Sequence, residues 1–177
     1  MVAVKDAAMD YSNTGISLLA MSHRSKPVME LFDETTDRLC SLLDIPEGYK
    51  VLWLQGGASL QFSMVPMNIL NEHETADYID TGAWSSKALK EARNFGSVNI
   101  AGSSKNDHYT FIPRYLEQHS ESVYLHITTN NTIYGTQYHV LPEINNNNGF
   151  LVADMSSDIL SMPIDISEFG LIYAGAQ

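Results

Sequence analysis

Four short segments of the sequence combine residue types that could bind a charged or planar ligand. The first is Gln55-Gly56-Gly57-Ala58-Ser59, where small residues separate an apolar run from a helical pattern. Backbone N–H groups at the start of a helix lie at the positive end of its dipole and can hold a phosphate. Glycine is also common in such turns for steric reasons alone, so this segment by itself supports a structural role equally well.

The second segment is Ser22-His23-Arg24-Ser25, directly before a predicted helix. The guanidinium fork of Arg24, beside His23, could bind a carboxylate or a phosphate through two parallel hydrogen bonds. A pair of solvated loop residues is the simpler interpretation when these residues are taken alone.

The third and fourth segments contain Asp154 and Trp84. Asp154 follows an apolar run over residues 150–153, and ligands of α/β proteins usually bind at the carboxyl ends of the strands. Its carboxylate could instead cap a helix. Trp84 follows a Thr-Gly-Ala turn and opens a predicted helix, where its ring could stack on a planar ligand or pack in the core.

The composition narrows the classes of partner. The 177 residues include 10 Lys and Arg against 21 Asp and Glu, a formal net charge of −11, which disfavours nucleic acid and anionic lipid. Apolar runs are too short to span a bilayer and the first residues lack a signal pattern, so we expect a cytoplasmic protein. The six histidines lack the spacing of a metal site, and we assign no metal.

Strand-like and helix-like segments alternate along the chain, which predicts an α/β fold with a largely parallel sheet covered by helices. We expect one domain, or part of a larger one, because 177 residues can enclose a single core. The Asn-rich tract at 145–149 is predicted to be a surface loop. The predicted helices are 25–44, 58–70, 85–95 and 112–119, and the predicted strands are 50–55, 76–80, 98–101, 123–128, 150–154 and 171–174.

The order and separation of these segments resemble the phosphoserine aminotransferase family, class V pyridoxal-phosphate enzymes of the aspartate-aminotransferase fold class. The resemblance covers nearly the whole chain. It implies a three-layer large domain with helices on both faces of the sheet, incomplete here because a leading segment and the C-terminal small domain are absent. The motifs that carry it are Ser22-His23-Arg24, Asn131-Thr132-Ile133-Tyr134-Gly135, Asp154-Met155-Ser156-Ser157, Leu160-Ser161-Met162-Pro163 and Tyr173-Ala174-Gly175-Ala176-Gln177.

The resemblance implies a role for each residue near the cofactor ring. Asp154 would pair with the pyridine nitrogen and keep it protonated, so that the ring can accept electrons. Trp84 would stack on the ring face, and the Thr132 hydroxyl would hydrogen-bond at the ring's edge.

The resemblance also implies two anion sites. Ala58, Ser59 and Gln177 would hold the cofactor phosphate through backbone and side-chain donors. His23 and Arg24 would take the distal anion of the substrate, either the phosphate of phosphoserine or the side-chain carboxylate of glutamate. Some members of the family have Gly-Arg in place of Ala58-Ser59, so the phosphate cradle of this chain would rely less on charge.

The implied reaction transfers an amino group from glutamate to 3-phosphohydroxypyruvate, giving 2-oxoglutarate and O-phosphoserine, in serine biosynthesis and, as an open alternative, in pyridoxine biosynthesis. In the family a Schiff-base lysine directly follows the Ala-Gly-Ala-Gln sequence, which here ends at Gln177. We therefore expect no catalytic residue within these residues and no activity of the chain alone. A homodimer is expected from the resemblance.

Two alternatives stay open. The chain could be a non-catalytic module that binds pyridoxal phosphate or a phosphorylated acid without chemistry. It could also be part of another aminotransferase of the same fold class that acts on alanine, glyoxylate or cysteine. The Ser22-His23-Arg24 motif argues against the second alternative, because an Arg-His pair suits a dianionic or phosphorylated substrate.

Overall fold

The computed structural model describes residues 2–145 and 149–176, so three residues of the Asn-rich tract lie outside it. The chain divides into two compact units, unit 1 over Met1–Val51 and unit 2 over Leu52–Gln177. Among the described residues, no helix is both long enough and apolar enough to cross a lipid bilayer.

Unit 1 is helical. Its long helix α2, Lys26–Leu43, begins after Ser25 with a proline in its first turn, and it ends at Asp44, whose φ of 49° is left-handed. Proline suits the first turn because the N–H that it lacks would have no partner within the helix there. The helix predicted over 25–44 is confirmed. Three short helices precede α2 and were not predicted from the sequence: α1 (Val2–Met9), η1 (Tyr11–Asn13) and η2 (Leu18–Ala20).

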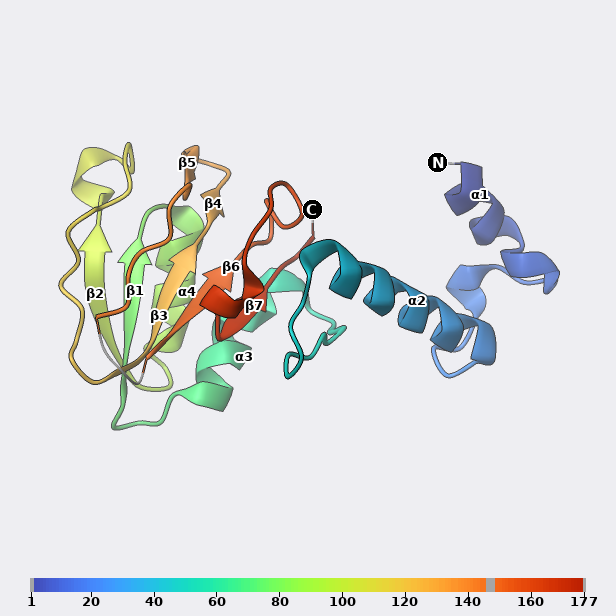
Figure 1. The fold of residues 1–177 in the computed structure, drawn as a ribbon, viewed down its shortest axis with the longest axis horizontal. Coiled ribbons are helices and arrows are strands. Elements are labelled where there is room, and N and C mark those ends of the chain that lie inside the picture. Colours follow the sequence, from blue (N-terminus) through green and yellow to red (C-terminus); the bar gives the residue numbers. More distant parts are fainter. Residues whose placement is uncertain (1, 146–148, 177) are drawn as a thin grey trace. The chain divides into compact units, whose positions relative to one another are not determined.

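Unit 2 is an α/β unit built on a parallel sheet. Its strands lie side by side in the order β2-β1-β3-β6-β7, and β4 and β5 form a separate antiparallel pair (Figure 1). The helices are α3 (Gly57–Ile69), α4 (Ala83–Ala92), η3 (Lys105–Asp107) and η4 (Ile166–Glu168). The strands are β1 (Thr75–Asp80), β2 (Ser97–Ser103), β3 (Ser122–Thr128), β4 (Asn130–Asn131), β5 (Thr136–Gln137), β6 (Phe150–Asp154) and β7 (Leu171–Tyr173).

Side chains alternate between the two faces of the sheet, and each face has its own apolar core. On one face, α3 and α4 pack against Tyr78, Tyr124 and Val152. On the opposite face, Ile127 and Leu151 pack against loop residues. The predicted α/β class with a mostly parallel sheet is confirmed. Within the described part of unit 2, loops cover the face opposite α3 and α4.

The strand predicted over residues 50–55 is wrong. These residues join neither edge of the five-stranded sheet, and Leu52 is 72% exposed. An apolar run shows that a segment could be buried, but a strand also needs a neighbouring strand to pair with. The edge strands of this sheet are β2 and β7, and residues 50–55 pair with neither of them.

The helix predicted over residues 112–119 is also wrong. Instead, the Glu117 N–H donates to the Ala101 carbonyl at 2.7 Å, and the Asn99 side chain donates to the Glu117 carbonyl at 2.8 Å, so the segment runs along strand β2. Ile112 and Leu116 pack on the sheet core with the i, i+4 spacing of a helix. Pro113, next to Ile112, disfavours helical backbone in the residue before it.

The central strand β3 gives a test of the core. Ile127 is fully buried, and we expect Ile127→Ala to lower the free energy of unfolding by about 2–5 kcal/mol, because it removes apolar contacts and leaves a cavity. The matched control is Ile133→Ala, at a position that is 62% exposed, where we expect little change. Urea unfolding followed by circular dichroism measures both. Equal losses in the two variants would contradict this assignment of the core.

Candidate functional site

Asp154 ends strand β6 with a buried carboxylate that is only 4% exposed. Its Oδ1 accepts hydrogen bonds from the Ser156 N–H at 3.0 Å and from the Ser156 hydroxyl at 2.5 Å. Burial raises the pKa of Asp154 above its usual value, while the two bonds from Ser156 oppose this rise. Neither ion pair found among the described residues includes Asp154. The site therefore holds a buried carboxylate that could pair with a cationic group of a ligand.

Ser156 links the loop after β6 to the segment after β7, which lies next to the start of α3. Its hydroxyl donates to Asp154 and accepts the Gly175 N–H at 3.0 Å. A Cβ added to Gly175 would lie 3.6 Å from the Cβ atoms of Ala58 and Ser156. The loop after β6, the end of β7 and the start of α3 therefore meet beside the Asp154 carboxylate.

The start of α3 depends on glycine. Gly56 is the N-cap residue with φ of 93°, and Gly57 follows with φ of 61°, both in the region that side chains disfavour. A Cβ on Gly56 would also come within 2.4 Å of the Leu60 side chain. The first-turn N–H groups have no partners within the helix, and Ala58 is half-buried while Ser59 is exposed. This is a suitable cradle for an anion.

Trp84 lies in the first turn of α4 and contacts the turn after β4. Its indole N–H donates to the Thr132 hydroxyl at 3.3 Å. The ring is half-buried, and the Lys87 ammonium lies 4.4 Å from its centroid, a cation–π contact. The structure thus places two of the predicted ring-binding residues in direct contact.

Buried polar bonds fix the turn that carries Thr132. The Asn131 side chain donates to the Thr81 hydroxyl at 3.0 Å, and the Thr136 hydroxyl donates to the Thr81 carbonyl at 2.8 Å. A Cβ on Gly82 would lie 2.3 Å from the Asn131 side-chain oxygen, so only glycine allows this approach. The Ser85 hydroxyl accepts the N–H groups of Thr81 and Gly82, each at 2.9 Å. Together these bonds hold the start of α4 against the Thr132 turn.

The same turn is bonded to the end of β6. Thr129 donates to the Asp154 carbonyl from its N–H at 3.0 Å and from its hydroxyl at 2.9 Å. The Asn130 side chain donates to the Ser157 hydroxyl at 3.0 Å. One hydrogen-bonded framework therefore connects the segments that carry Trp84, Thr132 and Asp154.

The structure brings some of the predicted site residues together. Ala58 and Asp154 meet through Ser156 and Gly175, and Trp84 contacts Thr132. Gln177 lies outside the described residues. The roles of all these residues stay predictions.

His23 and Arg24, the predicted substrate-binding pair, lie in unit 1. Both side chains are exposed, in a turn closed by a hydrogen bond of 2.9 Å from the Ser25 N–H to the Ser22 carbonyl. The turn places them immediately before α2. Their predicted role in binding the substrate stays a prediction.

Several residues that build the site were not predicted to have a role in it. Ser85, Thr129, Asn131 and Ser156 each supply a side chain to the framework. Their position directly after a strand or at the start of a helix was a usable signal, because the carboxyl ends of parallel strands share one edge. Their bonding partners, up to 50 residues away, were not visible in the sequence.

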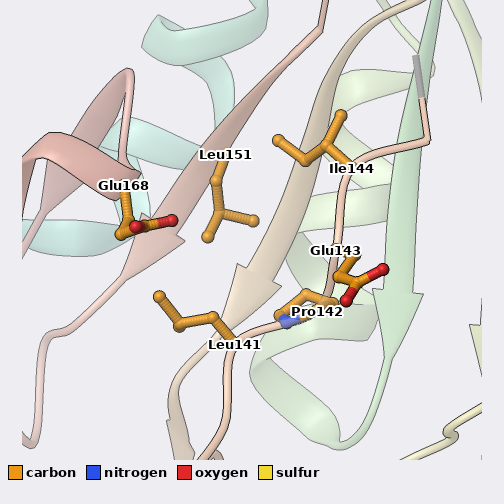
Figure 2. A pocket seen from close by; sticks show the side chains of 6 residues that line it. All are labelled: Leu141, Pro142, Glu143, Ile144, Leu151 and Glu168. Carbon is orange, nitrogen blue, oxygen red and sulfur yellow. The ribbon is translucent and has the colours of Figure 1, made fainter.

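A pocket on the other face of the sheet has a lining that differs from the surroundings of Asp154. Figure 2 shows its apolar side chains with the carboxylates of Glu143 and Glu168 on either side. The lining residues are Leu141, Pro142, Glu143, Ile144, Leu151 and Glu168. With two acidic groups and no basic group in its lining, this hollow does not suit a phosphorylated ligand.

The buried carboxylate gives a pH-dependent prediction. The folded chain binds the Asp154 proton more tightly than the unfolded chain, so this group makes the free energy of unfolding fall as pH rises from about 3.8 through its raised pKa. Asp154→Asn keeps an acceptor for Ser156 without the charge. We expect it to stabilise the ligand-free chain at pH 7 by about 1 kcal/mol, and this gain should vanish on acidification below pH 4.

The control for this prediction is Asp165→Asn. Hydrogen bonds from Ser167 lower the pKa of Asp165, and the Ser167 N–H bond caps a 3₁₀ helix, so this change should not stabilise the chain. Thermal unfolding at several pH values measures both variants. A destabilising Asp154→Asn at pH 7 would contradict the account.

Comparison with known proteins agrees with this geometry. The sequence pattern of the aminotransferase class-V family matches residues 1–177. The phosphoserine aminotransferase of Halalkalibacterium halodurans is 52% identical over 171 residues, which cover 96% of this chain and 47% of that protein. The corresponding enzyme of Nitrosomonas europaea is 48% identical, over 98% of this chain and 49% of the relative.

Solved structures give the same result. The phosphoserine aminotransferase of Bacillus circulans subsp. alkalophilus aligns with a TM-score of 0.91 at 46% identity, covering 98% of this chain and 48% of its own. The pyridoxal-phosphate-bound enzyme of Trichomonas vaginalis aligns with a TM-score of 0.87 at 33% identity, covering 98% and 50%. The chain spans about half the length of these relatives. It belongs to the class-V aminotransferase family.

Proposed function

We propose that this chain supplies the pyridoxal-phosphate-binding part of a phosphoserine aminotransferase. The observation that carries the proposal is the buried Asp154 carboxylate, which has no cationic partner among the described residues and lies beside the start of α3. A group that combines a basic ring nitrogen with a phosphate would satisfy both features. The curated relatives at about 50% identity are phosphoserine aminotransferases.

The chemistry of the donors fits this cofactor. Asp154, whose Oδ1 is oriented by Ser156, would hold a proton on the pyridine nitrogen as a buried ion pair. Trp84 offers a flat, half-buried face for stacking, and its bond to Thr132 fixes both side chains. When bound, the cofactor would supply an electron-accepting ring for amino-group transfer.

The start of α3 fits the phosphate. The first-turn N–H groups at Ala58 and Ser59 and the Ser59 hydroxyl are donors at the positive end of a 13-residue helix. Gln177 would add a side-chain donor. This cradle has no Lys or Arg of its own at positions 55–59, so oriented N–H groups, rather than a cationic side chain, would provide most of the attraction.

The proposed substrates are glutamate and 3-phosphohydroxypyruvate, as in serine biosynthesis. His23 and Arg24 would recognise the distal anion of either substrate, because a guanidinium fork binds a carboxylate or a phosphate through two bonds. The lysine that the resemblance places directly after Gln177 would complete the catalytic set. A cytoplasmic homodimer is the setting that we propose.

Cofactor binding gives the first test. In a Trp53→Phe background, Trp84 is the remaining tryptophan, and its fluorescence should be quenched as pyridoxal phosphate is added. We expect Asp154→Asn to weaken binding about 10-fold to 100-fold, the effect of losing a hydrogen bond between charged groups. Asp165→Asn is the exposed control and should bind like the parent. Equal affinity of all three proteins would contradict the proposed role of Asp154.

Substrate recognition gives the second test. The protein made from the gene's own reading frame is assayed with glutamate and 3-phosphohydroxypyruvate. We expect turnover, and we expect Arg24→Gln to raise KM for 3-phosphohydroxypyruvate about 10-fold or more, because a charge-assisted bond is lost. Lys26→Gln, another exposed cation of the same segment, is the control. Turnover with glyoxylate in place of 3-phosphohydroxypyruvate would favour another aminotransferase of the fold class.

A further inference from the structure

A second buried carboxylate, Asp80, ends strand β1 at the carboxyl edge of the sheet. It is 5% exposed, and side chains from two other segments donate to it. The Ser86 hydroxyl of α4 donates to Oδ1 at 2.6 Å, and the Tyr109 hydroxyl, from the loop after η3, donates to Oδ2 at 3.2 Å. The Ser85 hydroxyl lies 3.3 Å from Oδ1. Both carboxylate oxygens therefore have donors within the protein, which suits an anchor rather than a ligand-binding group.

The direction of these bonds follows from the number of protons. Asp80 accepts in each of its bonds, and each hydroxyl has one proton to donate. Ser86 directs its proton to Asp80, the nearer of its two partners, so the Ser86 oxygen accepts from the Tyr109 hydroxyl at 2.9 Å. Tyr109 thus donates to Asp80 and Ser86 together. The first turns of α4 and the loop after η3 are therefore held by one carboxylate.

The backbone around Tyr109 is strained. His108 and Tyr109 have φ of 55° and 57°, a left-handed conformation that is unfavourable for side chains of this size. Backbone hydrogen bonds connect the same loop to β1, because the Tyr109 N–H donates to the Ser104 carbonyl at 2.9 Å and the Ser104 N–H donates to the Asp80 carbonyl at 3.2 Å. Such strain persists where surrounding contacts compensate it, and it is enriched at functional sites.

These contacts lie on both sides of the bond between Trp84 and Thr132. Ser85 and Ser86 directly follow Trp84 in α4. On the other side, the Tyr109 ring packs against the ring of Tyr134, with centroids 4.7 Å apart and planes at 58°. Tyr134 belongs to the turn that carries Thr132, and its N–H donates to the Asn131 carbonyl at 3.2 Å. Asp80 is thus connected to Trp84 through α4 and to Thr132 through the two tyrosine rings.

We propose that Asp80, Ser86 and Tyr109 are positioning residues for Trp84 and Thr132. Asp80 and Ser86 fix the helix turn that carries the indole, and Tyr109 fixes the turn that carries the hydroxyl. The proposal rests on the proposed function only for the use of the indole as a stacking face. The hydrogen-bonded group itself is a property of the ligand-free protein.

The test is the exchange of the Trp84 indole N–H with water, measured by NMR on the ligand-free, ¹⁵N-labelled chain, with the signal identified by its loss in Trp84→Phe. An N–H exchanges when its hydrogen bond opens. Tyr109→Phe keeps the ring against Tyr134 but removes the hydroxyl, and we expect exchange to become about threefold to tenfold faster, the effect of one hydrogen bond.

Tyr124→Phe is the matched control for Tyr109→Phe. It removes a buried phenol hydroxyl that bonds to Tyr78 in the core, so it should lower overall stability without changing exchange at Trp84. Thermal unfolding of both variants separates a local effect from a loss of overall stability. Parent-like exchange in folded Tyr109→Phe would overturn the proposal.

A second pair of variants decides the matter if Tyr109→Phe does not fold. Ser86→Ala removes the 2.6 Å bond to Asp80 and should also speed exchange at Trp84. Ser63→Ala is its control, because the Ser63 hydroxyl likewise donates to a carboxylate, that of Glu91 at 3.1 Å. The same exchange rate in Ser86→Ala, Ser63→Ala and the parent would argue decisively against a positioning role.

Cofactor affinity separates this proposal from the proposed function. If both hold, Tyr109→Phe should weaken pyridoxal-phosphate binding about threefold to tenfold, because the indole is then held less often in its stacking position. Faster exchange in a chain that does not bind the cofactor would support the positioning role and contradict the proposed function. Cofactor binding that depends on Asp154, together with unchanged exchange, would do the reverse.

Discussion

The burial of one carboxylate, Asp154, is the constraint on which the rest of the site depends. A buried anion is costly unless donors or a cation compensate it. Here the donors from Ser156 do so only in part, because the pKa of Asp154 remains raised. A chain selected for stability alone would favour a neutral side chain at this position. A buried carboxylate at the carboxyl edge of a parallel sheet is typical of a binding group instead.

The register of the sheet brings the ends of the neighbouring strands close to Asp154. Asp154 pairs with Thr128 on one side and with Tyr173 on the other, so the loops that follow β3, β6 and β7 begin at the same level. The Ser156 hydroxyl accepts the Gly175 N–H, and Gly175 lies next to Ala58 in the first turn of α3. Fixed strand pairing therefore sets the separation between an acid that suits a ring nitrogen and a helix end that suits a phosphate.

The sequence predicted the five strands of the sheet and the helices α2, α3 and α4 because their apolar patterns are strong and their ends carry glycine, proline or polar residues. It failed at residues 50–55 and 112–119, where an apolar pattern is present but tertiary pairing decides the structure. Local pattern cannot show whether a sheet edge is free, or that residue 117 will bond to β2.

The site, too, could be predicted only where the local sequence was informative. The positions of Asp154 and Trp84 at the ends of elements were informative, since ligand groups of α/β folds gather there. The contacts of Asn131 with Thr81 and of Tyr109 with Asp80 join residues that are 50 and 29 positions apart, and only the folded sheet brings them together.

The protonation state of the cofactor's ring nitrogen tests the proposed role of Asp154 directly. Pyridoxal phosphate labelled with ¹⁵N in the ring is bound to the chain, and its ¹⁵N chemical shift is followed between pH 6 and pH 9. We expect a protonated nitrogen throughout this range in the parent, because the Asp154 anion stabilises the proton, and an unprotonated nitrogen in Asp154→Asn. The same unprotonated signal in both proteins would contradict it.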